Sequence, residues 1–168
     1  MSQEELNKQA RLSEHFTLGE MCKTSARTPD GNIPSRVHIE NLKRLCGWLE
    51  MLRSEWNRRY ANPKCPKADG GCEGNDPIII NSGYRSEAVN KAVGGVKGSN
   101  HLTGCAADIR VAGFEQLVRY AAILLDISDE RREDFDELLL ERSPKGGYWL
   151  HFAVRPTGNR RKVRLIQT

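Results

Sequence analysis

One stretch of this chain, residues 98–108, reads GSNHLTGCAAD and combines a turn with the start of a strand. The glycine and serine residues favour a turn, and the run AADIRV at residues 106–111 favours a strand. His101 lies in the turn, and Asp108 lies where the strand would project its carboxylate beside the histidine. His151 lies in YWLHF at residues 148–152, on a different predicted strand. The turn and the two strands therefore carry three residues that can bind a metal.

Two histidines and one carboxylate suit a catalytic zinc ion, because they leave a fourth position for water. The alternative is a buried histidine whose hydrogen bonds are satisfied by an aspartate. The other two of the four histidines, His15 and His38, have no acidic or histidine partner at ligand spacing. We interpret them as surface or helix-flanking residues.

Helices are predicted mainly in the first part of the chain. Apolar residues recur at steps of three and four after a cap at Ser35, which predicts an amphipathic helix: Leu42, Leu45, Leu49, Leu52 and Trp56. Residues 114–125 show the same pattern, and Ser86 is placed to cap a short helix that ends at Val93. Thr17 and Glu20 have the spacing of a capping box.

Strands are predicted mainly in the second part, at residues 78–80, 106–111, 135–141, 148–154 and 163–166. The third and fourth form a hairpin around residues 144–147. The predicted class is α+β, with a mainly antiparallel sheet flanked by helices. We assign residues 1–11 to a flexible N-terminus and residues 12–168 to a single domain.

The composition excludes several classes of protein. The chain has 168 residues and a formal net charge of +4, which is too small and too scattered to indicate nucleic-acid binding. No run approaches about 18 apolar residues, so no membrane insertion is expected. The first twenty residues contain no apolar block typical of a secretory signal, and we expect a monomer that is cytoplasmic when synthesised.

The five cysteines are an odd number, which argues against a simple disulfide framework. We expect ordinary reduced thiols, as in most intracellular proteins. Cys65 and Cys72 lie in a loop rich in proline and glycine, and either a disulfide or a shared metal remains open for this pair.

The motif Ser99-x-His101-x-x-Gly104-x-Ala106-x-Asp108, followed by WLH at residues 149–151, resembles the signature of the zinc D-alanyl-D-alanine peptidases. That family includes carboxypeptidases and the dipeptidases of vancomycin resistance, and it shares its fold with the hedgehog signalling domain. Three further runs resemble its small phage- and bacteria-encoded branch: LSEHFTLGEM at 12–21, IINSGYRS at 79–86 and NKAVGG at 90–95. The similarity spans residues 12–155.

The resemblance implies that His101, Asp108 and His151 bind one Zn²⁺ per chain. It also implies that Arg85 is a catalytic and substrate-binding residue, since a guanidinium can hold a substrate carboxylate or stabilise an oxyanion. Ser99 would orient the metal-binding loop and border the substrate, and Trp149 would shape the rim of the pocket.

The general base is the point at which the chain departs from the family pattern. Many members carry a glutamate three residues before the last histidine, where this chain has Tyr148. In the smaller branch a glutamate at the end of an apolar strand precedes Trp-x-His, which points to Glu141. If Glu141 lies opposite Trp149 or His151, it shares a sheet face with His151, but a slip of one residue would reverse this. We assign Asp136 and Glu137 to the end of the preceding turn.

The implied activity is zinc-dependent hydrolysis of peptidoglycan stem peptides, by a D-Ala-D-Ala carboxypeptidase or an L-Ala-D-Glu-type endopeptidase. Such an enzyme, possibly of the phage lysis type, would act on the cell wall once released or delivered there. One alternative is a non-catalytic zinc-binding recognition module on the same fold. Another is a cysteine hydrolase that uses Cys105 with His101, although no third group is evident to orient the histidine.

Overall fold

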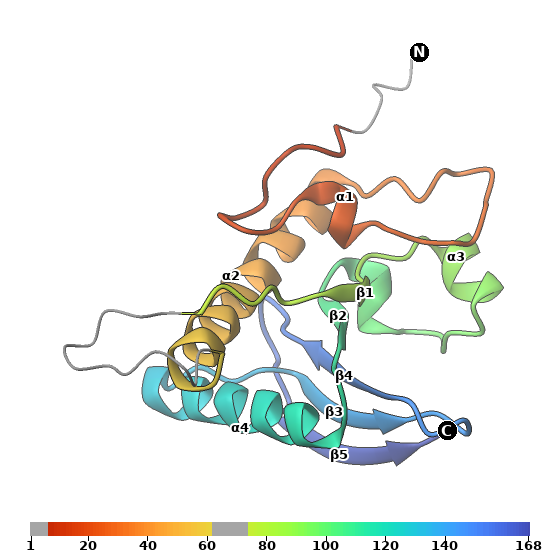
Figure 1. Ribbon diagram of the computed structural model, residues 1–168. Coiled ribbons are helices and arrows are strands. Elements are labelled where there is room, and N and C mark those ends of the chain that lie inside the picture. The colour runs from red at the N-terminus through yellow and green to blue at the C-terminus, as the bar shows by residue number, and fades with distance from the viewer. Residues whose placement is uncertain (1–6, 62–73) are drawn as a thin grey trace.

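The computed structural model of the protein describes residues 7–61 and 74–168. Its helices are α1 (Leu18–Met21), α2 (Arg36–Arg59), α3 (Glu87–Ala92), the 3-10 helix η1 (Asn100–Thr103) and α4 (Phe114–Arg131). Its strands are β1 (Ile80–Ser82), β2 (Ala106–Arg110), β3 (Glu137–Arg142), β4 (Tyr148–Ala153) and β5 (Lys162–Gln167). Figure 1 shows the two long helices on one side of the sheet.

Three predicted caps begin helices in the structure. Thr17 and Glu20 form a capping box at α1, and Ser35 forms one at α2 together with His38. Ser86 accepts a hydrogen bond from the backbone N–H of Val89 at the start of α3. These side chains satisfy backbone donors that have no partner inside the helix, which is why the helices start at these positions.

The five strands form one sheet in the order β1-β2-β4-β3-β5. The pairs β1/β2, β2/β4 and β3/β4 are antiparallel, and β3/β5 is parallel. The sheet is therefore mixed rather than purely antiparallel. β2 already pairs with the outer edge of β4. The segment after β4 therefore crosses the end of the hairpin, and β5 pairs with the free edge of β3.

The core lies between the sheet and the helices α2 and α4. The five apolar residues that predicted α2 are all buried, as are Leu117, Tyr120 and Leu124 of α4. The Trp48 ring of α2 lies 5.4 Å from the Phe152 ring of β4, between ring centroids. Since strand side chains alternate between faces, burial of Phe152 and Leu150 on the helix side turns His151 to the opposite face.

The structure corrects two predicted elements. The strand predicted at residues 78–80 is β1 at Ile80–Ser82, and Ile79 is 40% exposed. Because β1 is a short edge strand, the three isoleucines alternate in burial instead of forming a continuous buried run. The helix predicted to end at Leu125 continues to Arg131, since Ile127 and Ser128 are also buried.

The domain boundary at residue 12 stays a prediction. Of the segment assigned to a flexible N-terminus, Lys8 and Ala10 accept backbone hydrogen bonds from Gly19 and Leu18, at 2.9 and 2.8 Å. Within the described part of the chain, none of the helices has the length and apolar character that a membrane span requires.

Cys22, Cys46 and Cys105 are buried free thiols. Burial raises the pKa of the Cys22 and Cys46 thiols to about 12, and it also raises the pKa of Cys105. These thiols are therefore protonated and weakly reactive at neutral pH. Cys65 and Cys72 lie outside the described residues.

Candidate metal centre

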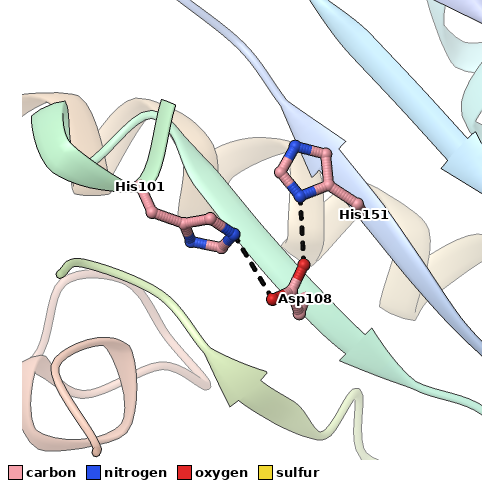
Figure 2. A group of neighbouring side chains, drawn as sticks. All are labelled: His101, Asp108 and His151. Atoms are coloured by element: carbon pink, nitrogen blue, oxygen red, sulfur yellow. Dashed lines mark hydrogen bonds and ion pairs between the residues drawn. The ribbon is translucent and has the colours of Figure 1, made fainter. Parts of the chain in front are cut away.

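The three predicted metal ligands lie together on the face of the sheet opposite α2 and α4. The register places Asp108 of β2 directly beside His151 of β4, and η1 holds His101 at the end of the same strands (Figure 2). Asp108 Oδ2 lies 3.3 Å from His101 Nε2, and Asp108 Oδ1 lies 3.0 Å from His151 Nδ1. One donor atom from each residue falls within 4.8 Å of the others, a spacing that fits a single ion.

His101 is held in place by its own turn. Ser99 Oγ accepts a hydrogen bond from the His101 backbone N–H, at 3.2 Å. The ring nitrogen Nδ1 lies 2.6 Å from the Gly83 carbonyl oxygen, to which it can donate. That bond leaves Nε2 as the acceptor atom, and Nε2 is the atom that faces Asp108.

Gly104 ends the turn and has a left-handed backbone conformation, with φ +74°. A Cβ at this position would lie 2.7 Å from the His38 carbonyl oxygen of α2. The glycine of the motif is therefore required where the turn packs on α2, because both the backbone angle and the close approach exclude a side chain.

His151 makes a contact through each ring nitrogen. Nδ1 faces Asp108, and Nε2 lies 3.1 Å from Glu137 Oε2. Burial lowers the pKa of His151, but the bonds to Asp108 and Glu137 outweigh burial and raise it to about 9. Burial raises the pKa of Asp108, but its bonds to the two histidines hold the pKa well below its usual range, so this carboxylate is ionised. An ionised carboxylate and two imidazole rings are donor types that suit a divalent cation, and such a cation would displace the proton from His151 Nδ1 when it binds.

Arg85 lies beside this donor set. Its Nη2 donates to Asp108 Oδ2 at 2.8 Å, and its Nε donates to Ser82 Oγ at 2.9 Å. The guanidinium is mostly buried, with 16% of the side chain exposed. Arg85 is therefore paired with a predicted metal ligand, Asp108, at a position that is largely shielded from solvent.

Glu141 pairs opposite Trp149 in the β3/β4 hairpin, in the register that the sequence analysis required. Directly opposite residues share a face, and so do residues two apart on one strand. Glu141 and Trp149 therefore lie on the same face as His151, and both are half-buried. Burial is the largest influence on the carboxyl of Glu141, and its pKa is raised.

The prediction that Glu137 lies at the end of a turn is wrong. Glu137 is the first residue of β3 and contacts His151 directly. Its Oε2 also accepts a hydrogen bond from Asn100 Nδ2, at 3.0 Å. The bond from His151 is the largest of the influences that lower the pKa of Glu137 to about 2. A signal was present in the sequence, because Glu137 and Glu141 are four residues apart and so share one strand face.

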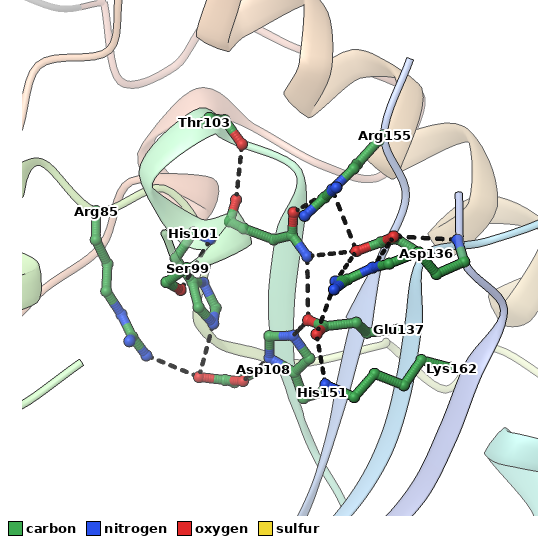
Figure 3. Close-up of polar contacts among 12 residues, drawn as sticks. Arg85, Ser99, His101, Thr103, Asp108, Asp136, Glu137, His151, Arg155 and Lys162 are labelled. Atoms are coloured by element: carbon green, nitrogen blue, oxygen red, sulfur yellow. Dashed lines mark hydrogen bonds and ion pairs between the residues drawn. The ribbon is translucent and has the colours of Figure 1, made fainter. Parts of the chain in front are cut away.

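Asp136, assigned to the same turn, is fully buried behind the site. Arg160 forms two bonds to its carboxylate, at 2.9 and 2.7 Å, and Asn100 Nδ2 donates a third at 2.8 Å. Arg155 Nε lies 3.2 Å from the same carboxylate (Figure 3). Arg155 and Arg160, from the segment between β4 and β5, therefore neutralise a buried acid.

Fold and site together define an α+β protein in which three clustered side chains, His101, Asp108 and His151, could hold a metal ion. A further carboxylate, Glu141, lies on the same face as these ligands. Ser99 caps the metal-binding turn, and Trp149 lies opposite Glu141.

One protein-family model matches part of the chain. The profile of the family described as Peptidase M15 matches residues 73–128, about one third of the chain. This match supports a zinc D-Ala-D-Ala carboxypeptidase-like member of the M15 family and confirms the resemblance drawn from the motifs. The matched segment contains Arg85, His101 and Asp108, whereas Glu141 and His151 follow it. No curated protein matched the chain.

Proposed function

We propose that the protein is a zinc-dependent peptidase that hydrolyses peptidoglycan stem peptides, with one Zn²⁺ per chain. The observation that supports this best is the grouping of His101 Nε2, Asp108 and His151 Nδ1 around one point, with donor atoms within 4.8 Å. The match of residues 73–128 to the Peptidase M15 family supports a metallopeptidase. The peptidoglycan substrate is our inference from the resemblance.

Zinc, when bound, would supply Lewis-acid activation of water and of the scissile carbonyl. Glu141 would accept the proton of the attacking water and deliver it to the leaving amine. Its half-buried position suits this role, because the raised pKa of the carboxyl moves it toward the working pH of a general base.

Arg85 would stabilise negative charge on the substrate, either a terminal carboxylate or the oxyanion of the scissile carbonyl. Its bond to Ser82 holds the guanidinium in one orientation beside Asp108. Trp149 provides an apolar surface next to Glu141, against which a substrate side chain can pack. The family resemblance implies that the substrate is a short peptide that contains D-amino acids.

Mass spectrometry of purified peptidoglycan after digestion tests the activity. Released D-alanine identifies a carboxypeptidase, and internally cut stems identify an endopeptidase. Either product supports the proposal. The absence of products across several wall chemistries would favour the non-catalytic zinc module instead, although that module has no need for Glu141 and Arg85.

Metal analysis tests the centre separately. Protein purified without added zinc should contain about one equivalent per chain, since four-coordinate zinc needs three protein ligands and a water. His151→Ala removes one ligand and should lose the metal. A wild-type protein that holds no metal, and that zinc does not activate, would contradict the proposed function.

A further inference from the structure

Glu137 contacts the third metal ligand on the side away from the metal position. Its Oε2 lies 3.1 Å from His151 Nε2, while His151 Nδ1 faces Asp108 at 3.0 Å. The Glu137 side chain is 14% exposed, and that of His151 is 10% exposed. The contact is therefore largely shielded from water, so solvent weakens it less than it weakens a surface pair.

The two ring nitrogens of histidine have different roles in a metal site. A neutral imidazole carries one N–H, and the other nitrogen has the lone pair that binds metal. When Glu137 accepts the Nε2–H, the lone pair lies on Nδ1. Nδ1 is the atom that faces Asp108, so the contact with Glu137 selects the tautomer that the centre requires.

Glu137 is itself fixed from several directions. Asn100 Nδ2 donates to Oε2, and Oε1 lies 3.1 Å from Arg160 Nη2. Oε1 also lies 3.4 Å from Lys162 Nζ (Figure 3). Asn100 precedes the ligand His101, and Lys162 begins β5. One carboxylate thus connects the turn that carries His101, the strand that carries His151 and the C-terminal strand.

We propose that Glu137 is a positioning residue for the metal centre: it orients the His151 ring and directs Nδ1 toward the ion. This inference rests on the proposed function, because it takes His151 to be a zinc ligand. The contacts with Asn100, Arg160 and Lys162 would prevent Glu137 from turning toward the ion as a ligand in its own right.

Zinc affinity, measured by competition with a chromophoric chelator, tests the proposal. Glu137→Ala should bind Zn²⁺ about 10–100-fold more weakly than the wild type, the usual cost of losing a partner that orients a ligand. Glu137→Gln should lose less than ~10-fold, because the amide oxygen can still accept the Nε2–H.

Two control variants separate positioning from general damage. Glu141→Gln changes a carboxylate on the same strand and face but lies opposite Trp149, and it should keep wild-type zinc affinity. Lys162→Ala removes one of the contacts that hold Glu137 but leaves the contact between Glu137 and His151, so it should weaken zinc binding much less than Glu137→Ala. Equal weakening in Lys162→Ala and Glu137→Ala would contradict the proposal and indicate a structural role.

The ring N–H proton of His151 gives a second readout by NMR, assigned by its loss in His151→Ala. A hydrogen bond to a carboxylate shifts this proton downfield and slows its exchange, with or without zinc, so Glu137→Ala should remove the signal. If Glu137→Ala changes neither the N–H signal of His151 nor the zinc affinity, the inference about Glu137 is overturned, but the proposed metal centre is not. A wild type that binds no zinc, but whose signal depends on Glu137, would contradict the proposed function while supporting the contact.

Discussion

Three carboxylates in residues 136–141 differ in what surrounds them, and their roles follow from those surroundings. Asp136 is fully buried among arginines, and Glu137 accepts hydrogen bonds at the back of His151. Glu141 is half-buried beside Trp149, with a raised pKa. Of the three, Glu141 is therefore the one suited to exchange a proton with substrate water.

At the residue scale we predict that Glu141→Gln keeps zinc and loses about 10²–10⁴-fold in kcat, the usual contribution of a general base. The amide keeps the size of the side chain but cannot accept the proton. Peptide hydrolysis and zinc content should be measured on the same preparation. Glu50→Gln, on the distant helix α2, serves as the control; full activity of Glu141→Gln would direct the search to another base.

The turn at residues 98–105 joins the candidate metal ligands to the core. One side of the turn carries His101, and the other side packs on α2, where Gly104 approaches the His38 carbonyl. Asn41 of α2 also donates a hydrogen bond to the Thr103 carbonyl, at 2.9 Å. These contacts with α2 therefore fix the position of the turn relative to the sheet.

At the element scale we predict that Gly104→Ala is more destabilising than Gly94→Ala. Both glycines have positive φ, which costs a residue with a Cβ roughly 1–2 kcal/mol. A Cβ at residue 104 would also meet the His38 oxygen, whereas a Cβ at residue 94 would meet no atom of the described chain within 4 Å. Denaturant unfolding measures the difference, and equal losses would show that the approach to α2 costs nothing.

At the scale of the whole molecule, Asp136 connects the C-terminal segment to the sheet. Its backbone N–H bonds to the Ala153 carbonyl, and its carboxylate binds Arg160 and Asn100. Burial raises the pKa of this carboxyl, but the bonds from Arg160 and Asn100 lower the pKa by more, so the net shift is downward. A carboxyl whose pKa is lower in the folded than in the unfolded protein contributes stability that acid removes.

We therefore predict that the stabilisation due to Asp136 is complete at pH values well above the ordinary aspartate pKa of about 4, and that it is lost as the pH falls through the lower pKa of the folded protein. In that window the unfolded chain binds more protons, so acid favours unfolding. Asp136→Asn should be about 1–3 kcal/mol less stable at pH 7. Between pH 7 and pH 3 it should lose less free energy of unfolding than the wild type; equal losses in urea unfolding would contradict this.

Features that depend on local sequence could be predicted, for physical reasons that particular residues illustrate. Ser35 and Ser86 satisfy donors within one turn of helix, and the apolar spacing of α2 is a property of that segment alone. Parallel pairing of β5 with β3 could not be predicted in this way. It depends on which sheet edge remains free once β2 has paired with β4.

Local sequence predicts the capped helices and the hairpin, and the motif points to His101, Asp108 and His151 as candidate metal ligands, since each inference depends on residues close in the chain or on a family pattern. How these parts meet depends on contacts between distant segments. Strand register places Glu141 on the same sheet face as His151. Folding of the sheet brings the Glu137 carboxylate within hydrogen-bond distance of Asn100 Nδ2. The reason is that a shift of one residue reverses every side chain of a strand, so register is set by contacts among distant segments.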